Sequence, residues 1–488
     1  MIPQLRNRIQ LNLPWLGILM LIILSIGFLL PVLPNDFWWY LRLGKDITLS
    51  GSIPISDSYS STVFGQPTFY PMWLSAVLLS SLFHVGELSL VVLSRGVLIS
   101  LFYLALWIIA IRKGIPGWIA TLLTLVCALA GANNWAVRPQ MFVYPLFGFL
   151  LMILDDTKFQ NLSRSEDEKT SYRSVSNQYY WLIPISFLWS NLHGSVIILF
   201  LLTIPYFLFY QRNRKFFIIL LLSLLATFIN PRGPLMWWDT LQIIQAVGNQ
   251  FSQEWKPPIN SGWQMNLFFM WILLFIPLVA LSKNKLKTFE WIWFLGFGWM
   301  ALTGTRYIIW FLAILLIISS HLLKGLMRDN IFQVNFSNFK LNYVLLIIMI
   351  LLPIFLLPDI REHWWADSPE VITTNTPIEA SKWIQNNIKP EGIIFNDYLF
   401  GSYMIFALPD HPVWIDSRFY PYPESLWQDY LAISNAEHNW VDKIENYQID
   451  HFFLDKNSQQ NLITALNQSK QFCLKYTDLT ASIFSRCK

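Results

Sequence analysis

The chain has 488 residues, of which 54% are hydrophobic and only 13% are charged. Soluble globular proteins carry roughly 25% charged residues, so this composition excludes an ordinary soluble protein and indicates a membrane protein with several spans. The net charge of +4 is small and the basic residues are dispersed along the chain, which excludes the clustered basic surface of a nucleic-acid-binding protein.

Eleven apolar segments are long enough, with their polar ends, to cross a membrane as helices. The first is not followed by a small-residue cleavage site, so we expect it to be retained as a helix rather than removed as a signal peptide. A further stretch at 69–86 is ambiguous, because it could span the membrane or form a juxtamembrane or re-entrant helix. The eleven segments lie near 14–33, 88–111, 115–131, 140–154, 179–191, 194–211, 216–230, 265–282, 288–303, 306–323 and 341–357.

Basic residues indicate the topology, because short cytoplasmic loops are enriched in Lys and Arg. If the N-terminus is inside and 69–86 does not cross, every basic cluster falls on the inner side. If 69–86 crossed, all the later clusters would lie outside. We therefore predict about eleven crossings, with 34–87 outside and 155–178 inside. The inner residues are Arg6, Arg8, Arg112, Lys113, Lys158, Arg164, Lys169, Arg173, Arg212, Arg214, Lys215, Lys283, Lys285, Lys287, Lys324, Arg328 and Lys340.

The predicted outer turns are short and carry unusual polar residues. The candidate functional residues are therefore expected on the outer face. The cytoplasmic loops show only the basic residues that orient the helices in the membrane. These turns are NDFWWY (35–40), NNWAVRPQ (133–140), WSNLHGS (189–195), NPRG (230–233), EWKPP (254–258) and TGTRY (303–307).

The C-terminal region, 358–488, changes character and is predicted to be a soluble α/β domain outside the membrane. A helix is expected after Thr376-Pro377. Three apolar runs, each followed by an acid, are typical of buried strands: EGIIFND (391–397), HPVWIDSR (411–418) and IDHFFLD (449–455). The fold class is thus a mainly α-helical, polytopic membrane domain (1–357), with juxtamembrane helices in its first outer loop, followed by this α/β domain.

The last residues predict a β-hairpin that carries two cysteines. If the turn covers 478–481 and centres on Thr480, residue n faces residue 960 − n, and Cys473 faces Cys487. Cross-strand neighbours have Cβ atoms about 4.5–5.5 Å apart, near the range that a disulfide accepts. We expect a disulfide in the oxidising outer compartment. The alternative is two free thiols.

Asp36 directly follows the first apolar segment. A carboxylate at the end of a membrane helix is partly desolvated, which raises its proton affinity and suits it to act as a base. The alternative is an interfacial acid that caps the following helix, with Trp38 and Trp39 in the aromatic belt of the membrane. The residue alone favours the second interpretation.

Three arginines, Arg95, Arg138 and Arg306, lie within or at the outer ends of apolar segments. A guanidinium there costs a few kcal/mol or more, so each needs an anionic partner. A lipid phosphate fits, because its oxygens match the guanidinium fork. The alternative for each arginine is structural pairing with Glu254, with Asp57 or with backbone carbonyls.

His193 lies in an outer turn beside Asn191, Gly194 and Ser195. A lone histidine near a helix end is more often a structural hydrogen-bonding residue, but these neighbours also suit donation to a diphosphate or sugar. Arg232, in the NPRG turn, is a further candidate for phosphate binding.

No motif for a metalloprotease, a P-loop, a nucleophile elbow or a cysteine–histidine metal site is present. We therefore expect no cofactor. Asp36 and Glu254 could hold a divalent metal, although nothing in the sequence requires one.

The chain resembles integral membrane proteins of the C-type glycosyltransferase superfamily (GT-C), which includes protein O-mannosyltransferases and aminoarabinose transferases. The resemblance rests on Asp36 after the first helix, then on GSIPISDSYS, PMWLS, VRPQ, NLHGS, NPRG, TGTRY and the C-terminal FNDYLFGSYMIF and VWIDSR. It departs from relatives at Tyr40, where histidine is common, and in VRPQ, which lacks a second acid.

The resemblance implies a membrane glycosyltransferase of the bacterial inner membrane and cell envelope. It would move a sugar from a polyprenyl-phosphate carrier to a glycan or protein acceptor outside, by inversion, with Asp36 as the base and Arg138, Arg306 and His193 near the phosphate. Asp36 is expected within about 10 Å of Arg138 or Arg306, the scale of a small-molecule pocket.

Two alternatives remain open. The first is a non-catalytic relative that binds a lipid-linked glycan or a partner protein. The second, ranked lowest, is a transporter, which would favour paired broken helices and acids near mid-membrane. The only deep acid in the sequence, Glu290, lies near the inner end of its segment.

Overall fold

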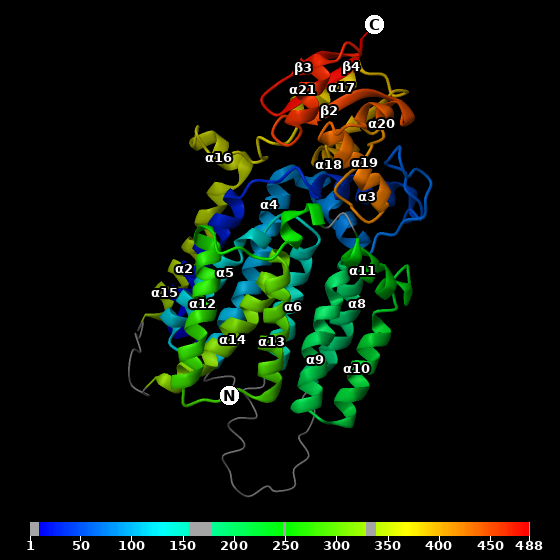
Figure 1. Cartoon of the computed structure of the whole chain (residues 1–488). Coiled ribbons are helices and arrows are strands. Elements are labelled where there is room, and N and C mark those ends of the chain that lie inside the picture. The colour runs from blue at the N-terminus through cyan, green and yellow to red at the C-terminus, as the bar shows by residue number, and fades with distance from the viewer. Residues whose placement is uncertain (1–8, 156–176, 247–249, 328–337, 488) are drawn as a thin grey trace, which may run out of the picture. The chain divides into compact units, whose positions relative to one another are not determined.

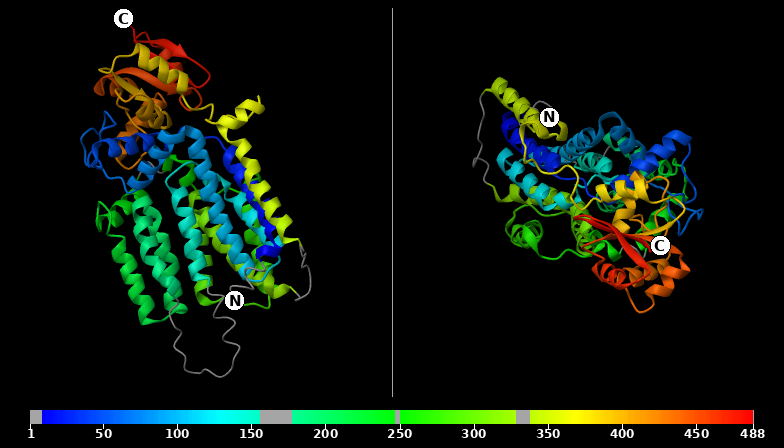
Figure 2. Two further views of the ribbon diagram at one scale, coloured as in Figure 1. Left: turned by 180° about the vertical axis from the view of Figure 1, so that it is seen from behind. Right: turned by 90° about the horizontal axis from the view of Figure 1, so that it is seen from above.

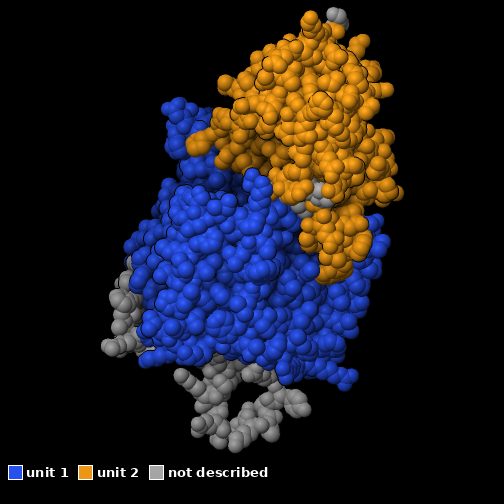
Figure 3. Space-filling model, viewed as in Figure 1, with its two compact units in different colours: residues 1–30, 89–236, 253–368 blue, residues 31–88, 237–252, 369–488 orange. Residues whose placement is uncertain are grey.

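A computed structural model describes residues 9–155, 177–246, 250–327 and 338–487. Its contacts divide the chain into two compact units (Figure 3). The first, which we call the helical unit, comprises residues 1–30, 89–236 and 253–368. The second, the mixed unit, comprises residues 31–88, 237–252 and 369–488. The predicted inner residues Arg6, Arg8, Lys158, Arg164, Lys169, Arg173 and Arg328, and most of loop 155–178, lie outside the described residues.

The helical unit is a bundle (Figure 1), and each of the eleven predicted apolar segments contains one of its helices. The helices are α2 (Leu13–Leu29), α4 (Trp73–Arg112), α5 (Gly117–Ala130), α6 (Gln140–Leu154), α8 (Leu182–Leu192), α9 (Ile197–Phe209), α10 (Arg214–Ala226), α12 (Gly262–Leu281), α13 (Thr288–Thr303), α14 (Ile308–Leu326), α15 (Phe339–Leu351) and the short α16 (Pro358–Trp364). Short 3-10 turns are η1 (Ala132–Asn134), η2 (Asn177–Trp181), η3 (Gly194–Val196), η5 (Gln253–Trp255), η6 (Thr305–Tyr307) and η7 (Leu352–Leu356).

Helix α14 lies in the interior of this bundle. All its residues from Ile308 to Ser320 are buried, and it packs against α5, α12 and α13. A helix that is apolar on every side can be covered by other helices or by lipid, and α14 is covered by other helices. At another position, α2 and α15 run side by side, as Figure 2 shows from behind.

Within the described parts of the chain, three helical segments are long and apolar enough to cross a membrane: Trp73–Arg112, Gly262–Leu281 and Thr305–Leu326. A fourth is added if the pair Lys340–Leu356 and Pro358–Trp364, bent by 80°, is one span. The other helices of the bundle are shorter than a single upright span requires. The number of eleven crossings and the side of each loop therefore stay predictions.

The ambiguous stretch at 69–86 forms the first part of α4. A straight helix of 40 residues would be about 60 Å long, roughly twice the hydrocarbon thickness of a bilayer. Helix α4 is interrupted at Gly86 and Glu87. Glu87 has a φ of +46°, a backbone conformation that residues other than glycine rarely adopt. The boundary between the mixed unit and the helical unit, between Leu88 and Ser89, lies directly after this break.

The mixed unit contains a four-stranded sheet in the order β1-β2-β4-β3. Strand β1 is parallel to β2, and the other two pairs are antiparallel. The strands are β1 (Ile393–Asn396), β2 (Ile449–Asp455), β3 (Phe472–Thr477) and β4 (Ala481–Arg486), and the helices are α3 (Phe37–Ser50), α17 (Ile378–Asn387), α18 (Tyr398–Ala407), α19 (Glu424–Ser434), α20 (Trp440–Asn446) and α21 (Gln460–Gln468). Helix α11 (Leu235–Gln245) begins in residues of the helical unit and continues into this one.

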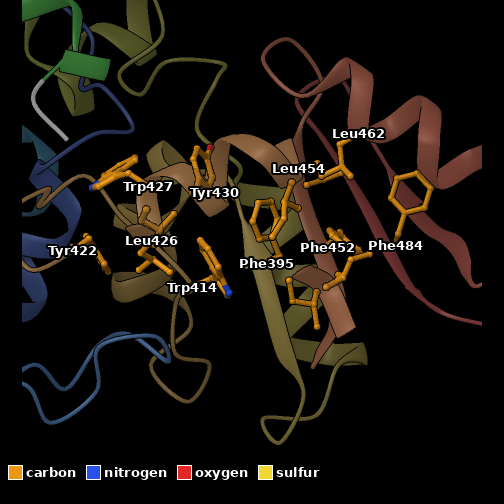
Figure 4. Packing of buried hydrophobic residues seen from close by; sticks show 14 of the residues in the cluster. Phe395, Trp414, Tyr422, Leu426, Trp427, Tyr430, Phe452, Leu454, Leu462 and Phe484 are labelled. Atoms are coloured by element: carbon orange, nitrogen blue, oxygen red, sulfur yellow. The ribbon is translucent and has the colours of Figure 1, made fainter. Parts of the chain in front are cut away.

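Aromatic and aliphatic side chains from the strands and helices converge to form the core of the mixed unit (Figure 4). Phe395 of β1 packs against Trp414 and Phe452, with ring centroids 5.0 and 5.8 Å apart. The predicted C-terminal α/β domain is thus present, and helix α17 begins directly after Thr376-Pro377 as expected.

The run HPVWIDSR does not form the predicted strand. Its residues Val413, Trp414 and Ile415 are fully buried, so the burial was predicted correctly and the secondary structure was wrong. The amide of Asn396 accepts from the Trp414 backbone N–H and donates to the Ile415 carbonyl, both at 2.8 Å. A side chain therefore satisfies the backbone groups that a neighbouring strand would otherwise pair.

The first outer loop is part of the same compact unit as the C-terminal domain. Ser60 and Val413 form a parallel β-bridge, the Thr62 hydroxyl donates to the Trp414 carbonyl at 2.6 Å, and Val63 belongs to the core. The predicted domain boundary at 357/358 separates the residues expected in the membrane from those expected outside it. Because the structure contains no membrane, this boundary stays a prediction.

The disulfide between Cys473 and Cys487 is present, so this prediction is confirmed, but the predicted register is wrong. Cys473 pairs with Ser485, not with Cys487. The turn centres between Leu479 and Thr480, and an irregularity between Leu474 and Tyr476 shifts the pairing further. The total shift of two positions keeps both cysteines on the same face, as a diagonal pair.

Candidate functional site

Four of the predicted outer turns meet at one end of the helical unit. Arg138, at the start of α6, forms an ion pair with Glu254 of η5. Arg306 of η6 places Nη1 3.9 Å from Oε1 of the same carboxylate. The hydroxyl of Thr305 donates to the Glu254 carbonyl at 3.1 Å, which holds the two turns together. These turns therefore lie together within this unit, and their place on the outer face of the membrane stays a prediction.

Arg306 is held by stacking rather than by hydrogen bonds. Its guanidinium carbon lies 3.9 Å from the centroid of the Trp255 ring, a cation–π distance. The side chain is 20% exposed. Among the described residues, the Arg306 guanidinium donates no hydrogen bond, because its 3.9 Å approach to Glu254 is an ion-pair distance only. Its N–H groups therefore remain available to an anion.

Glu254 is ionised in this environment. Burial alone would raise its pKa, but the nearby guanidinium groups of Arg138 and Arg306 outweigh burial and lower the pKa below its usual value. Two positive charges and one negative charge give the cluster a net charge of +1. We call these three residues the arginine cluster.

His193 lies beside the arginine cluster and is neutral. Its Nδ1 accepts from the Ser195 backbone N–H at 3.0 Å and lies 2.9 Å from the Ser195 hydroxyl, which in turn accepts from the Trp189 indole at 3.0 Å. Burial, followed by repulsion from Arg306 and Arg138, lowers the pKa of His193 to about 3. With Nδ1 accepting, the proton sits on Nε2, which can donate to a ligand.

Two other predicted residues of this unit have structural contacts. The Asn191 amide donates to the carbonyl oxygens of Phe187 and Ile229, both at 2.9 Å, and so connects α8 to the residue that precedes the NPRG turn. Arg232 is exposed in that turn, where its backbone N–H donates to the Asn230 side chain at 2.8 Å.

Arg95 does not join the arginine cluster. It is completely buried and donates to the Gly27 carbonyl at 2.6 and 3.0 Å and to the Leu30 carbonyl. These carbonyls lie at the C-terminal end of α2, where partial negative charge accumulates. This is the backbone pairing that the sequence left open as an alternative, and we leave Arg95 out of the proposed site.

Asp36 belongs to the mixed unit, where it precedes α3. It makes no side-chain capping hydrogen bond to that helix, so the capping interpretation is not observed. Instead, its Oδ1 accepts from the Ser417 hydroxyl at 2.7 Å. Asp36 is partly exposed. Since Arg138 and Arg306 belong to the other unit, the predicted separation of about 10 Å stays a prediction.

A buried ion cluster that the sequence did not predict lies next to Ser417. Arg418 donates from Nε to both oxygens of Asp416 at 2.9 Å, and it also pairs with Asp57. The hydroxyls of Tyr422 and Tyr70 lie 3.1 and 3.3 Å from its guanidinium. Burial would lower the pKa of Arg418, but these acids and tyrosines raise it well above its usual value. Asp57, which the sequence offered as a possible structural partner of Arg95, Arg138 or Arg306 and as a candidate residue of the substrate site, pairs instead with Arg418. The only sequence signal was the Asp-Ser-Arg triplet after a buried run.

The described residues contain no group of three or more histidine, cysteine or acidic side chains that could hold a metal ion. Asp36 and Glu254, the two residues considered for a metal, belong to different units. The expectation that no cofactor is needed remains untested.

The fold is similar to that of two solved transferases. The chain is similar to the oligosaccharyltransferase of Archaeoglobus fulgidus, solved with a tethered acceptor peptide that contains the NVT sequon, with 12% identity and a TM-score of 0.58. The match covers 98% of this chain and 74% of that one, and the apo form of the same enzyme gives a TM-score of 0.57.

A second similar structure is the arabinofuranosyltransferase AftD from Mycobacteria, with 12% identity and a TM-score of 0.55. That match covers 96% of this chain but only 41% of AftD. At this level of identity the likeness shows the fold alone. No protein-family model and no curated protein matches the sequence.

Proposed function

We propose that the protein is a membrane glycosyltransferase that moves a sugar from a polyprenyl-phosphate carrier to a hydroxyl group of a glycan or protein acceptor on the outer face of a bacterial inner membrane. The observation that carries the proposal is Arg306, whose guanidinium stacks on Trp255 and has no hydrogen-bond acceptor among the described residues. A partly buried cation of this kind suits an incoming phosphate.

The arginine cluster supplies both charge and hydrogen-bond donors. Each guanidinium carries five N–H donors in a fork that matches phosphate oxygens, and the Nε2–H of neutral His193 adds another. Glu254 balances one of the two positive charges. It also holds Arg138 and Arg306 near each other before a ligand arrives, so less ordering is required on binding.

The charge balance suits departure of the carrier. A sugar-linked polyprenyl phosphate is a phosphodiester with one negative charge, whereas the released carrier is a monoester with a charge of about −1.5 to −2 at pH 7. The cluster therefore binds the transition state, in which this charge develops, more strongly than the ground state. Only such differential binding accelerates the chemical step.

In the proposed reaction, Asp36 accepts the proton of the acceptor hydroxyl while the hydroxyl oxygen attacks the anomeric carbon. The bond between that carbon and the phosphate oxygen breaks, and its electron pair stays on the phosphate. Attack opposite to the leaving group inverts the anomeric configuration. Its partial exposure and its lack of a capping role support Asp36 as the base.

Binding of the phosphate is tested with decaprenyl phosphate and, as the uncharged comparison, decaprenol, added to purified protein in detergent. Native mass spectrometry should show preferential retention of the phosphate. Arg306→Gln should weaken binding of the phosphate by tenfold or more, as expected for a charge-assisted hydrogen bond. Arg212→Gln, which removes an exposed arginine beyond the other end of α9, is the matched control. Equal binding of both lipids would refute the phosphate site.

Catalysis is tested by reconstituting the protein in vesicles with a panel of polyprenyl-phosphate sugars and measuring release of the phosphate carrier. Asp36→Asn should abolish release without lowering the melting temperature, and full turnover by this variant would remove Asp36 as the base. Phosphate binding without release from any donor would favour the non-catalytic, glycan-binding relative.

A further inference from the structure

The carboxylate proposed as the base receives a hydrogen bond from the other end of the sequence. The Ser417 hydroxyl donates to Asp36 Oδ1 at 2.7 Å, across a sequence separation of 381 residues. Both residues belong to the mixed unit. Ser417 is buried and Asp36 is partly exposed, so the serine approaches the acid from its protein side.

Ser417 is fixed in place by both of its neighbours in sequence. Asp416 and Arg418 are fully buried and paired with each other, and Arg418 is also paired with Asp57 of the first outer loop. The preceding residues approach α18 closely, because a Cβ on Gly401 would lie 2.3 Å from the Ile415 carbonyl oxygen. The loop at 415–418 therefore has little freedom, and the serine hydroxyl is held at one position.

Asp36 is also fixed from the other side. The Ser402 hydroxyl of α18 donates to the carbonyl of Asn35, and the backbone N–H of Trp39 donates to Ser402 at 3.4 Å. Both partners of the contact between Ser417 and Asp36 are thus anchored on α18, and the hydrogen bond has a defined geometry.

We propose that Ser417 is a positioning residue for Asp36, donating to Oδ1 so that Oδ2 is directed to the acceptor and the carboxylate stays ionised. The role of Asp36 as a base rests on the proposed function. The contact between Ser417 and Asp36 does not depend on it. A hydrogen bond to the charged form of an acid stabilises that form.

Other charged and titratable groups act on Asp36 as well. Tyr398 of α18 lies within electrostatic range of it, and the cluster of Asp57, Asp416 and Arg418 carries a net charge of −1. Negative charge nearby favours the protonated acid, so these groups oppose the effect of Ser417. The serine hydroxyl stabilises the charged carboxylate against this effect.

The test measures protonation of Asp36 without a sugar substrate. The hydrophobic reagent dicyclohexylcarbodiimide modifies protonated carboxyl groups, so labelling of Asp36 falls as pH rises through its titration. Labelling of the full-length protein in detergent is quantified by peptide mass spectrometry, with Asp36→Asn as the unlabelled reference. In Ser417→Ala, the midpoint should move up by about one pH unit, a tenfold change in the ionisation constant.

Two further variants separate positioning from structure. Ser417→Thr keeps a hydroxyl and should restore the wild-type midpoint. Thr62→Ala removes the hydroxyl contact to the Trp414 carbonyl in the same loop and should leave the midpoint unchanged. An unchanged midpoint in Ser417→Ala, or an equal shift in Thr62→Ala, would overturn the inference.

The labelling result is independent of whether the protein transfers a sugar. If Asp36→Asn keeps full turnover, the proposed base is refuted while a midpoint shift in Ser417→Ala still establishes the contact. If Asp36 is the base and Ser417 positions it, Ser417→Ala should lower kcat most on the acidic side of the pH profile. The KM for the donor should stay unchanged, because the phosphate contacts lie elsewhere in the chain.

Discussion

Replacing Arg418 with methionine tests the buried ion cluster of the mixed unit. Methionine fills a similar volume without charge, and it leaves Asp57 and Asp416, which are at most 1% exposed, without their shared cation. Removing one partner of a buried ion pair costs about 3–5 kcal/mol, because an uncompensated charge remains. For a domain of roughly 150–250 residues, this corresponds to a fall in melting temperature of about 6–20 °C.

The melting temperature is measured by tryptophan fluorescence in detergent, since Trp414 and Trp427 lie in the core of this unit. Arg486→Met is the matched control, because Arg486 is 37% exposed and pairs with Glu445 at the surface, where such pairs contribute about 0–1 kcal/mol. If Arg418→Met melted within 2 °C of the wild type, or no lower than Arg486→Met, the argument from burial and charge would be wrong.

Three further predictions concern the C-terminal domain and the topology. Cys473→Ser removes a disulfide that spans 14 residues and should cost about 3 kcal/mol, measured by denaturant unfolding. Burial and then Asp455 raise the pKa of Asp397 to about 6, so the folded state holds this proton more tightly than the unfolded chain. Stability should therefore fall by about 2 kcal/mol as the pH rises from 4 to 6, and Asp397→Asn should remove that slope. Cysteines introduced at Ser165 and Ser458 should show opposite accessibility to an impermeant thiol reagent in intact cells, and equal labelling would contradict the predicted topology.

Apolarity predicted the helices well, because a helix that crosses or fills a bundle must be apolar over most of its length. Composition did not show which helix is interior, because α12 is as apolar as α14 and yet far less buried. The same signal could not give the secondary structure of HPVWIDSR, because burial requires only that the backbone groups find partners. The Asn396 side chain provides those partners.

The candidate site was predicted in part. Charge in an apolar setting identified Arg138 and Arg306, since a buried cation demands an anion. The sequence could not show that Glu254 would serve both, or that Arg95 would bind only backbone carbonyls. Ser417 could not be found at all, because an ordinary serine 381 residues from its partner carries no signal of that contact.

The mixed unit joins residues before Leu88 to residues after Pro369, and this has a consequence for biosynthesis. At 5–20 residues per second, translation of the intervening stretch of about 280 residues takes about 15–60 s. Throughout that time the first outer loop is already made but cannot complete its fold, and Asp36 lacks its serine. A nascent chain released before residue 417 therefore carries Asp36 without its partner. Completion of this contact is tied to completion of the polypeptide itself.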